Sequence, residues 1–217
     1  SILKRSLDKE ICILVDENDQ FVGTASKREC HRVGAKGDLL LHRAFSVFIF
    51  NNKGEMLVHK RSNSKVTFPN LYTNSCCSHP LFIDGKEEDV VTAALRKLNQ
   101  ELGIPLDQMD PQAFSFVCRF LYKDPGDGVW GEYELDHVMI YQDDLTIKPN
   151  PNEVAECAYF SKKDFDSFVA SSKYPLTPWF DLMRRKLLPL WWDNLHCLHK
   201  VSDPHYIHTF TAGDKRC

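Results

Sequence analysis

The chain has 217 residues, a formal net charge of −3, 43% hydrophobic residues and 26% charged residues. This length fits one large domain better than two, and the composition is that of a folded protein with a buried core. The acidic balance argues against a nucleic-acid-binding protein, and no run reaches the roughly 18 apolar residues that a membrane span requires.

The eight cysteines contain no C-x-x-C pair and no zinc-ribbon spacing. The first residues also lack the apolar core and cleavage site of a secretory signal, so we expect reduced thiols and a cytoplasmic protein. A peroxisomal or other organellar location stays an alternative, because the sequence does not begin with Met. Cys76 and Cys77 stand out because they are adjacent and have polar neighbours.

The first elements in chain order are two hairpins. Residues 12–15 and 21–22 read as strands around the turn 16–20, which is rich in Asp and Asn. Residues 46–50 and 55–60 form a clearer pair around a turn that contains Gly54.

A helix is predicted over residues 87–103. Its apolar residues recur at i, i+4, i+7 and i+11, which places them on one face, and Gly103 and Pro105 end the pattern. These apolar residues are Val91, Leu95, Leu98 and Leu102.

Two further strands are predicted at 114–122 and 132–141, with a turn-rich loop at 124–128 between them. Ser161 with Asp164 indicates the start of a short helix that ends near Ser171.

The C-terminal part is predicted to be helical. Thr177 and Pro178 have the types expected of an N-cap and a first helical residue, and Pro189 should kink or interrupt the helix. After residue 205 no pattern is left. We expect a single domain over residues 1–205 and a flexible tail over 206–217, the domain being of the α+β class with a mixed sheet flanked by helices.

Residue types alone give two weak indications of chemistry. Glu132 and Glu134 are two apart at the start of a predicted strand, so their carboxylates point to one face. Cys77 and His79 have the same spacing. Each pair suits a metal or catalytic site, and each is also compatible with a solvated polar face or with ordinary loop residues.

The predicted helix carries a partial match to the Nudix box, with which that superfamily holds metal-bound diphosphates. Lys97 and Gln100 stand where hydrolases of the superfamily have glutamates that bind metals and activate water, and the leading glycine is shifted to Gly85. The matching positions are Glu88, Arg96, Leu98, Glu101, Gly103 and Ile104.

A more specific resemblance comes from an ordered set of segments. Over residues 10–205 the chain resembles type I isopentenyl diphosphate isomerase, a Nudix-fold enzyme, and residues 191–194 (WWDN) resemble its eukaryotic branch. The segments are 41–47 (LHRAFSV), 61–65 (RSNSK), 73–80 (TNSCCSHP), 100–104 (QELGI), 130–136 (WGEYELD) and 177–179 (TPW). The resemblance implies a Nudix-like mixed sheet layered with flanking helices, with extra N-terminal strands and C-terminal helices.

The resemblance also implies the reaction, which interconverts isopentenyl and dimethylallyl diphosphate through a carbocation-like intermediate. By its place in the family motif N-S-x-C-x-H-P, the reactive thiol is Cys77, and Glu134 is the second acid–base group. Tyr122 matches the residue that hydrogen-bonds this carboxylate. Trp179 matches the tryptophan that faces the developing cation; a simple core aromatic is the alternative.

Metal and diphosphate ligands are implied in the same way. Three histidines and two glutamates would bind one divalent metal, which is Zn²⁺, Mn²⁺ or Mg²⁺. Glu101 would help to hold a second ion, Mg²⁺, on the diphosphate. The first set is His31, His42, His79, Glu132 and Glu134, and the diphosphate-binding residues would be Lys27, Arg61, Lys65 and Lys97.

The expected partner is therefore a small prenyl diphosphate bound by a monomer. Three alternatives stay open from the residues: a Nudix hydrolase, a metal-binding module without activity, and a redox sensor built on Cys76 and Cys77. Hydrolysis is disfavoured by Lys97 and Gln100, and the redox sensor is disfavoured because adjacent cysteines form only a strained disulfide.

Overall fold

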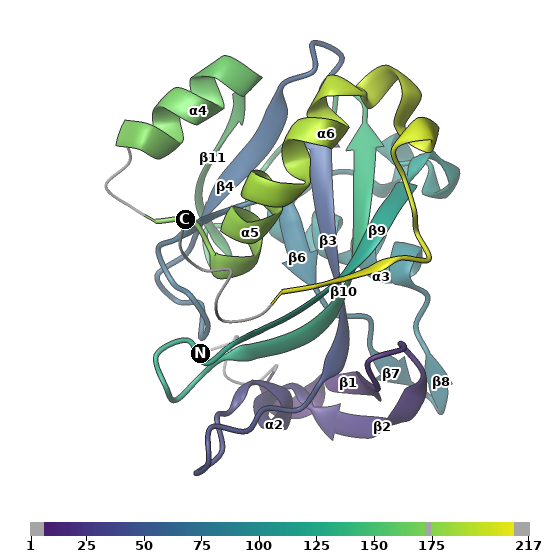
Figure 1. Ribbon diagram of the computed structural model, residues 1–217, viewed down its shortest axis with the longest axis vertical. Helices are drawn as coiled ribbons and strands as arrows, with labels where there is room; N and C mark the ends of the chain where they lie inside the picture. The colour runs from purple at the N-terminus through teal and green to yellow at the C-terminus, as the bar shows by residue number, and fades with distance from the viewer. Residues whose placement is uncertain (1–6, 172–174, 211–217) are drawn as a thin grey trace.

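The structure is a computed structural model that describes residues 7–171 and 175–210 (Figure 1). Within these residues the centre is a mixed ten-stranded sheet whose main path runs β11–β4–β3–β10–β9–β12. A separate hairpin consists of β7 (Phe82–Ile83) and β8 (Lys86–Glu87). The strands of the sheet are β1 (Ile11–Val15), β2 (Phe21–Ser26), β3 (His42–Phe50), β4 (Met56–Arg61), β5 (Tyr72–Thr73), β6 (Cys76–Ser78), β9 (Ser115–Asp124), β10 (Glu132–Gln142), β11 (Val154–Phe160) and β12 (Ile207–Thr209).

Helices cover both faces of this sheet. In Figure 1, α5 (Pro178–Lys186) and α6 (Leu188–Asp193) lie in front of β3, and α4 (Lys162–Ser171) lies beside β11. Helix α3 (Val90–Leu102) packs on the other face, and α2 (Lys27–His31) follows β2. Short 3₁₀ turns occur at Leu106–Gln108, Pro111–Ala113 and Leu195–Lys200.

Each face of the sheet has its own apolar core. Phe48 and Trp191 belong to the core under α5 and α6, whereas Val47 and Leu98 belong to the core under α3. Because side chains alternate along a strand, the neighbours Val47 and Phe48 point into different cores. A strand covered on both sides is buried almost throughout, as β3 is. In the described ranges no helix is long and apolar enough to cross a membrane.

The register of the sheet brings distant residues together. Strand β10 runs parallel to β3 and places Glu134 opposite His42. On its other side β10 is antiparallel to β9, which places Tyr122 opposite Glu134. Strand β6 is antiparallel to β3 and places Cys77 opposite Ser46. Residues far apart in sequence thus meet near one end of the sheet.

The predicted α+β architecture is confirmed, with differences at several boundaries. The predicted helix 87–103 begins only at Val90, because Glu87 belongs to β8 and Asp89 caps the helix by accepting from Thr92 N–H. It ends as predicted at Gly103, which has φ = 62°. The predicted C-terminal helix is interrupted between α5 and α6, close to Pro189, which was expected to kink or interrupt it.

Several elements were not predicted, among them the short strands β5 to β8, helix α2 and strand β11. Helix α2 has a capping box in which Ser26 and Glu29 satisfy each other's backbone N–H groups, so the S-x-x-E pattern at 26–29 was an overlooked signal. Strand β11 has no clear alternation of buried and exposed residues, so its local pattern does not indicate a strand. It is a strand because it pairs with β4.

Within the expected tail 206–217, Ile207–Thr209 form β12. This strand pairs with β9 in parallel, and Arg119 of β9 also donates to the His205 carbonyl. Pairing with a strand more than eighty residues away leaves no local signal in a short polar segment. The rest of the predicted tail, residues 211–217, lies outside the described residues.

Candidate active site

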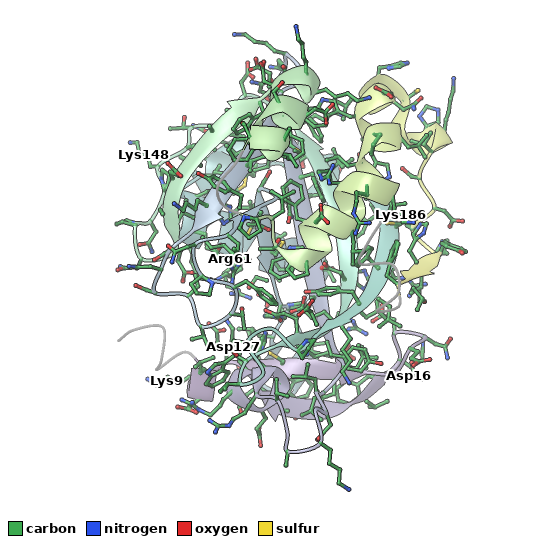
Figure 2. All side chains as sticks on the ribbon, turned by 60° about the vertical axis from the view of Figure 1, so that its left-hand side comes forward. Lys9, Asp16, Arg61, Asp127, Lys148 and Lys186 are labelled. Atoms are coloured by element: carbon green, nitrogen blue, oxygen red, sulfur yellow. The ribbon has the colours of Figure 1, made fainter. Side chains whose placement is uncertain are left out.

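A pocket near the N-terminal ends of β3 and β10 contains both expected acid–base residues. Cys77 and Glu134 line it together with Trp179, and cationic side chains from Lys27, Arg61 and Lys65 also face it. Figure 2 shows Arg61 near the middle of the molecule, between the C-terminal helices and the N-terminal strands at the bottom of the view.

Three histidines and two glutamates form a buried cluster on one side of this pocket. One ligand atom from each residue lies within 4.8 Å of the corresponding atom of every other residue. His31 ends α2, His42 begins β3, and His79 directly follows β6. Glu132 and Glu134 are both on the same face of β10, as their spacing predicts.

Backbone contacts aim the histidine rings into the cluster. His31 Nδ1 lies 2.7 Å from the Lys27 carbonyl oxygen, and His42 Nδ1 lies 2.8 Å from that of Leu40. A carbonyl bound to one ring nitrogen leaves the other free to coordinate a metal. The Nε2 atoms are close to carboxylates, with His31 Nε2 3.0 Å from Glu132 and His79 Nε2 2.5 Å from Glu134; among the described residues His79 Nδ1 has no hydrogen-bond partner.

This donor set fits a divalent cation. Imidazole nitrogens and carboxylate oxygens together suit Zn²⁺, Mn²⁺ or Mg²⁺. Among the described residues, His42 Nε2 and Glu132 Oε2 are buried without a hydrogen-bond partner, although buried polar atoms are normally paired. A cation at the centre of the cluster would satisfy both atoms.

Burial and mutual charge set the protonation of the cluster. Burial alone would raise the pKa of Glu134, but the neighbouring His42 imidazolium outweighs it and lowers this pKa to about 2. In turn, burial would lower the pKa of His42, but Glu134 raises it to about 9. Burial and the charges of His42 and His31 lower the pKa of His79. Glu134 is therefore ionised at neutral pH, as a metal ligand and proton acceptor must be.

On the thiol side, β6 separates the two adjacent cysteines. Cys76 is buried in the core beneath α3, whereas Cys77 faces the pocket on the opposite side of the strand. Cys77 Sγ lies 3.0 Å from Asn74 Oδ1, 3.3 Å from Ser46 Oγ and 3.1 Å from Trp179 Nε1. Burial, assisted by the charge of Asp136, raises the pKa of Cys77 to about 12, so the group is a thiol at neutral pH.

Aromatic residues connect the two sides of the pocket. The Tyr122 hydroxyl donates to Glu134 Oε2 at 2.5 Å, as the resemblance implied. The rings of Tyr122 and Trp179 have centroids 5.9 Å apart, and Phe68 packs edge-on against Trp179 at 5.4 Å. Trp179 is 3% exposed, because Thr177 and Pro178 start α5 against the sheet.

The three cationic residues of the pocket already contact other groups. Lys27 pairs with Glu10 at 2.7 Å and Lys65 pairs with Glu153 at 2.6 Å. Arg61 donates from Nη2 to the Thr67 carbonyl at 2.8 Å, and its guanidinium lies 5.6 Å from the centre of the Trp179 ring.

Lys97 and Glu101 are not among the pocket-lining residues. They form a buried ion pair of 3.0 Å on α3, with Lys65 3.9 Å from Glu101. Burial alone would raise the pKa of Glu101, but Lys97 and Lys65 lower it well below its usual value. Both lysine ammonium groups face the same oxygen, Glu101 Oε1.

Asn74, Ser46 and Asp136 were not predicted as site residues. Ser46 Oγ donates to Asp136 Oδ2 at 2.8 Å, and both side chains are buried beside the Cys77 thiol. Burial and the charge of Glu134 raise the pKa of Asp136. All three lie inside segments that carried the resemblance, 41–47, 73–80 and 130–136, and that position was the available signal.

Comparisons with known proteins agree with this geometry. Residues 40–180 match the NUDIX domain family. Isopentenyl-diphosphate Delta-isomerase 1 of Mesocricetus auratus is 44% identical over 207 residues, which cover 92% of this chain and 91% of the relative. Isopentenyl-diphosphate Delta-isomerase of Dictyostelium discoideum is 42% identical over 210 residues, covering 91% and 88%.

A solved structure supports the fold. The crystal structure of DR0079 from Deinococcus radiodurans superposes with a TM-score of 0.59 at 20% identity, covering 82% of this chain and 99% of DR0079. The sequence relatives are eukaryotic, in agreement with the resemblance of residues 191–194. The chain therefore belongs to the isopentenyl-diphosphate Delta-isomerase family and has the fold of a NUDIX domain.

Proposed function

We propose that this chain interconverts isopentenyl diphosphate and dimethylallyl diphosphate, with Cys77 and Glu134 as its acid–base pair. One observation carries the proposal: a protonated thiol and an ionised carboxylate line the same pocket. The names of the relatives support the same reaction.

The reaction adds a proton to one carbon of the five-carbon unit and removes a proton from another, so the site must hold one proton donor and one acceptor at the start. Cys77 is the proton donor, since burial keeps its thiol protonated. Glu134 is the acceptor form, and the hydroxyl of Tyr122 orients its Oε2 oxygen. After one turnover Cys77 has lost a proton and Glu134 has gained one, and return of a proton to Cys77 from Glu134, directly or through solvent, restores the pair.

Trp179 is proposed to stabilise the developing cation. Cation–π attraction in a desolvated site contributes about 2 kcal/mol. A ring face also cannot capture a carbocation as a lone pair would. Trp179 is buried, lines the pocket, and donates its indole N–H to Cys77 Sγ, so the ring lies next to the proposed proton donor.

The buried cluster of three histidines and two glutamates is proposed to hold one Zn²⁺, Mn²⁺ or Mg²⁺ ion. A bound divalent cation would offset the buried negative charge and tune the proton affinity of Glu134. The role of this chain is to orient Glu134, through His42, His79 and Tyr122.

Arg61, Lys65 and Lys27 are proposed to bind the diphosphate, because their side chains line the same pocket as the acid–base pair. Lys97 and Glu101 do not line the pocket and lie next to Lys65. Lys97 is proposed to contribute positive charge for the diphosphate, and Glu101 would help to hold a Mg²⁺ ion that is bound with it. The 3.9 Å distance from Glu101 Oε1 to Lys65, which lines the pocket, supports this role for Glu101. Its ion pair with Lys97 also disfavours hydrolysis, because a lysine occupies the place of a metal-binding glutamate.

Incubation with isopentenyl diphosphate in D₂O tests the reaction. The expected product is dimethylallyl diphosphate that carries deuterium, detected by NMR and mass spectrometry. Release of inorganic phosphate or pyrophosphate without migration of the double bond would instead identify a hydrolase.

The Cys77→Ala variant tests the acid–base assignment. It should be folded and inactive, while the matched variant of Cys157, which lies in β11 away from the pocket lining, should keep full activity. An active Cys77→Ala enzyme would refute the role of the thiol.

A cytoplasmic location and a monomeric state stay predictions, which fractionation and light scattering can check.

A further inference from the structure

A buried chain of hydrogen bonds connects the segment that carries Cys77 to the helix that carries Trp179. The Thr177 hydroxyl donates to Thr73 Oγ1 at 2.9 Å, and the Thr73 hydroxyl donates to Asn74 Oδ1 at 3.0 Å. All three residues are 0% exposed. Buried polar groups cost free energy unless they are paired, so this arrangement is tightly specified.

The orientation of the Asn74 amide is fixed by its nitrogen. Asn74 Nδ2 donates to the carbonyl of Val47 on β3 at 3.1 Å and to that of Cys76 at 3.2 Å. Only the NH₂ end of an amide can donate, so the reversed orientation would place an oxygen against two carbonyl oxygens. Asn74 Oδ1 must therefore face the pocket.

This one oxygen accepts from both proposed catalytic side chains. Cys77 S–H donates to Asn74 Oδ1 at 3.0 Å, and the Trp179 indole N–H lies 3.2 Å from the same oxygen. The indole N–H also lies 3.1 Å from Cys77 Sγ. Thiol, indole and amide thus form a closed triangle, in which a shift of the amide would move the other two groups.

Thr177 gives independent support for this reading. Threonine just before a helix normally caps it with its hydroxyl, which contributes about 1 kcal/mol. Among the described residues the Thr177 side chain makes no capping hydrogen bond to α5. Its hydroxyl is directed at Thr73 instead, so the start of α5 is attached to the Asn74 segment at the expense of the cap.

We infer that Asn74 is a positioning residue of the isomerase, orienting the Cys77 thiol and the Trp179 ring, and that Thr73 and Thr177 hold it in place. The inference rests on the proposed function, in which Cys77 and Trp179 act on the substrate. Misplacement of a reacting group by about 1 Å can lower a rate roughly 10²-fold. Loss of Asn74 should therefore lower kcat and leave KM unchanged, because Arg61 and Lys65 still bind the diphosphate.

The test is steady-state kinetics with isopentenyl diphosphate on the full chain. Asn74→Ala should lower kcat roughly 10²-fold. Thr73→Val keeps the shape of the side chain and removes two neutral hydrogen bonds, the one to Asn74 Oδ1 and the one from Thr177, and kcat should fall about tenfold. Thr73→Ser restores the hydroxyl and should restore kcat. If Asn74→Ala fails to fold, the comparison of Thr73→Val with Thr73→Ser still tests the inference.

Ser75→Ala is the matched structural control. Ser75 is equally buried and also makes two hydrogen bonds, but these go to Ile49 N–H and the Leu57 carbonyl, on the α3 side of the sheet. This variant should lose thermal stability and keep its kcat. An equal fall in kcat for Ser75→Ala and Thr73→Val would overturn the inference, since it would show a general effect of destabilisation.

Cys77→Ala, assayed in parallel, separates this inference from the proposed function. An inactive Cys77→Ala enzyme together with unchanged kcat for folded Asn74→Ala and Thr73→Val would overturn the positioning role alone. An active Cys77→Ala enzyme would overturn the proposed acid–base pair and the positioning role with it. A fall in kcat for Thr73→Val, with rescue by Thr73→Ser and unchanged KM, supports both.

Discussion

Asp19, in the turn between β1 and β2, has a carboxylate that two arginines and one histidine contact. Arg43 lies 2.8 Å away, His137 2.7 Å and Arg119 3.3 Å. The Asp19 side chain is only 8% exposed. The contacts join the N-terminal hairpin to β3, β9 and β10, on the side of the sheet away from the pocket.

The free energy of this cluster follows from the pKa of Asp19. Burial alone would raise this pKa, but His137 and then Arg43 outweigh it and lower it from 3.8 to about 2. One pKa unit corresponds to 1.36 kcal/mol, so the charged carboxylate stabilises the fold by about 2 kcal/mol at neutral pH. Because the folded pKa is the lower one, this contribution is complete above about pH 4 and is lost as the pH falls towards 2.

Asp19→Asn isolates the charge, because asparagine tolerates the positive φ of 65° at this position. Urea unfolding at pH 7 should show a loss of about 2 kcal/mol, and the difference from the parent protein should shrink between pH 4 and pH 2.

Asp16→Asn is the matched control in the same turn. Its side chain accepts from the backbone N–H groups of Asn18 and Gln20, which asparagine can also do, so stability should not change. A loss for Asp19→Asn that is the same at pH 7 and pH 3 would refute the electrostatic explanation.

Three further predictions concern the site. Tyr122→Phe removes the donor to Glu134 Oε2 and should lower kcat about tenfold to a hundredfold in steady-state assays; an unchanged kcat would contradict its role. Cys76→Ala should keep its activity and lose about 1 kcal/mol of unfolding free energy, because Cys76 packs under α3; a folded but inactive variant would mean that Cys76 is the reactive thiol. Chelator treatment should lower activity and melting temperature, and divalent metal should restore both; indifference to chelation would exclude the His/Glu cluster as a metal site.

The sequence predicted those elements whose signal is local. The hairpin turn at Gly54, the helix stop at Gly103 and the helix start at Pro178 each depend on residues within one turn of the chain. Helix α2 had a local signal in its capping box as well, but five residues are too few for an apolar periodicity.

Local sequence patterns could not predict the elements that depend on pairing with distant strands. Strand β12 depends on β9, and β11 depends on β4. The position of Asn74 in the segment 73–80 did not reveal its contacts, because its three donors come from Thr73, Cys77 and Trp179, and the last of these is more than a hundred residues away. The resemblance named the residues that touch substrate and metal, whereas the groups that hold them in place became visible only in the folded chain.

The register of β3 against β10 has a consequence for how the protein folds. Glu134 lies opposite His42, and the two strands are separated by more than eighty residues of chain. A slip of one residue would turn Glu134 and Glu132 away from the histidines, because side chains alternate along a strand. Parallel pairing at such sequence separation is slow to form, since a long loop must close first. In a refolding experiment the return of activity should therefore lag behind the return of helical circular dichroism, and enzymatic turnover would report the moment at which the central strands find their correct alignment.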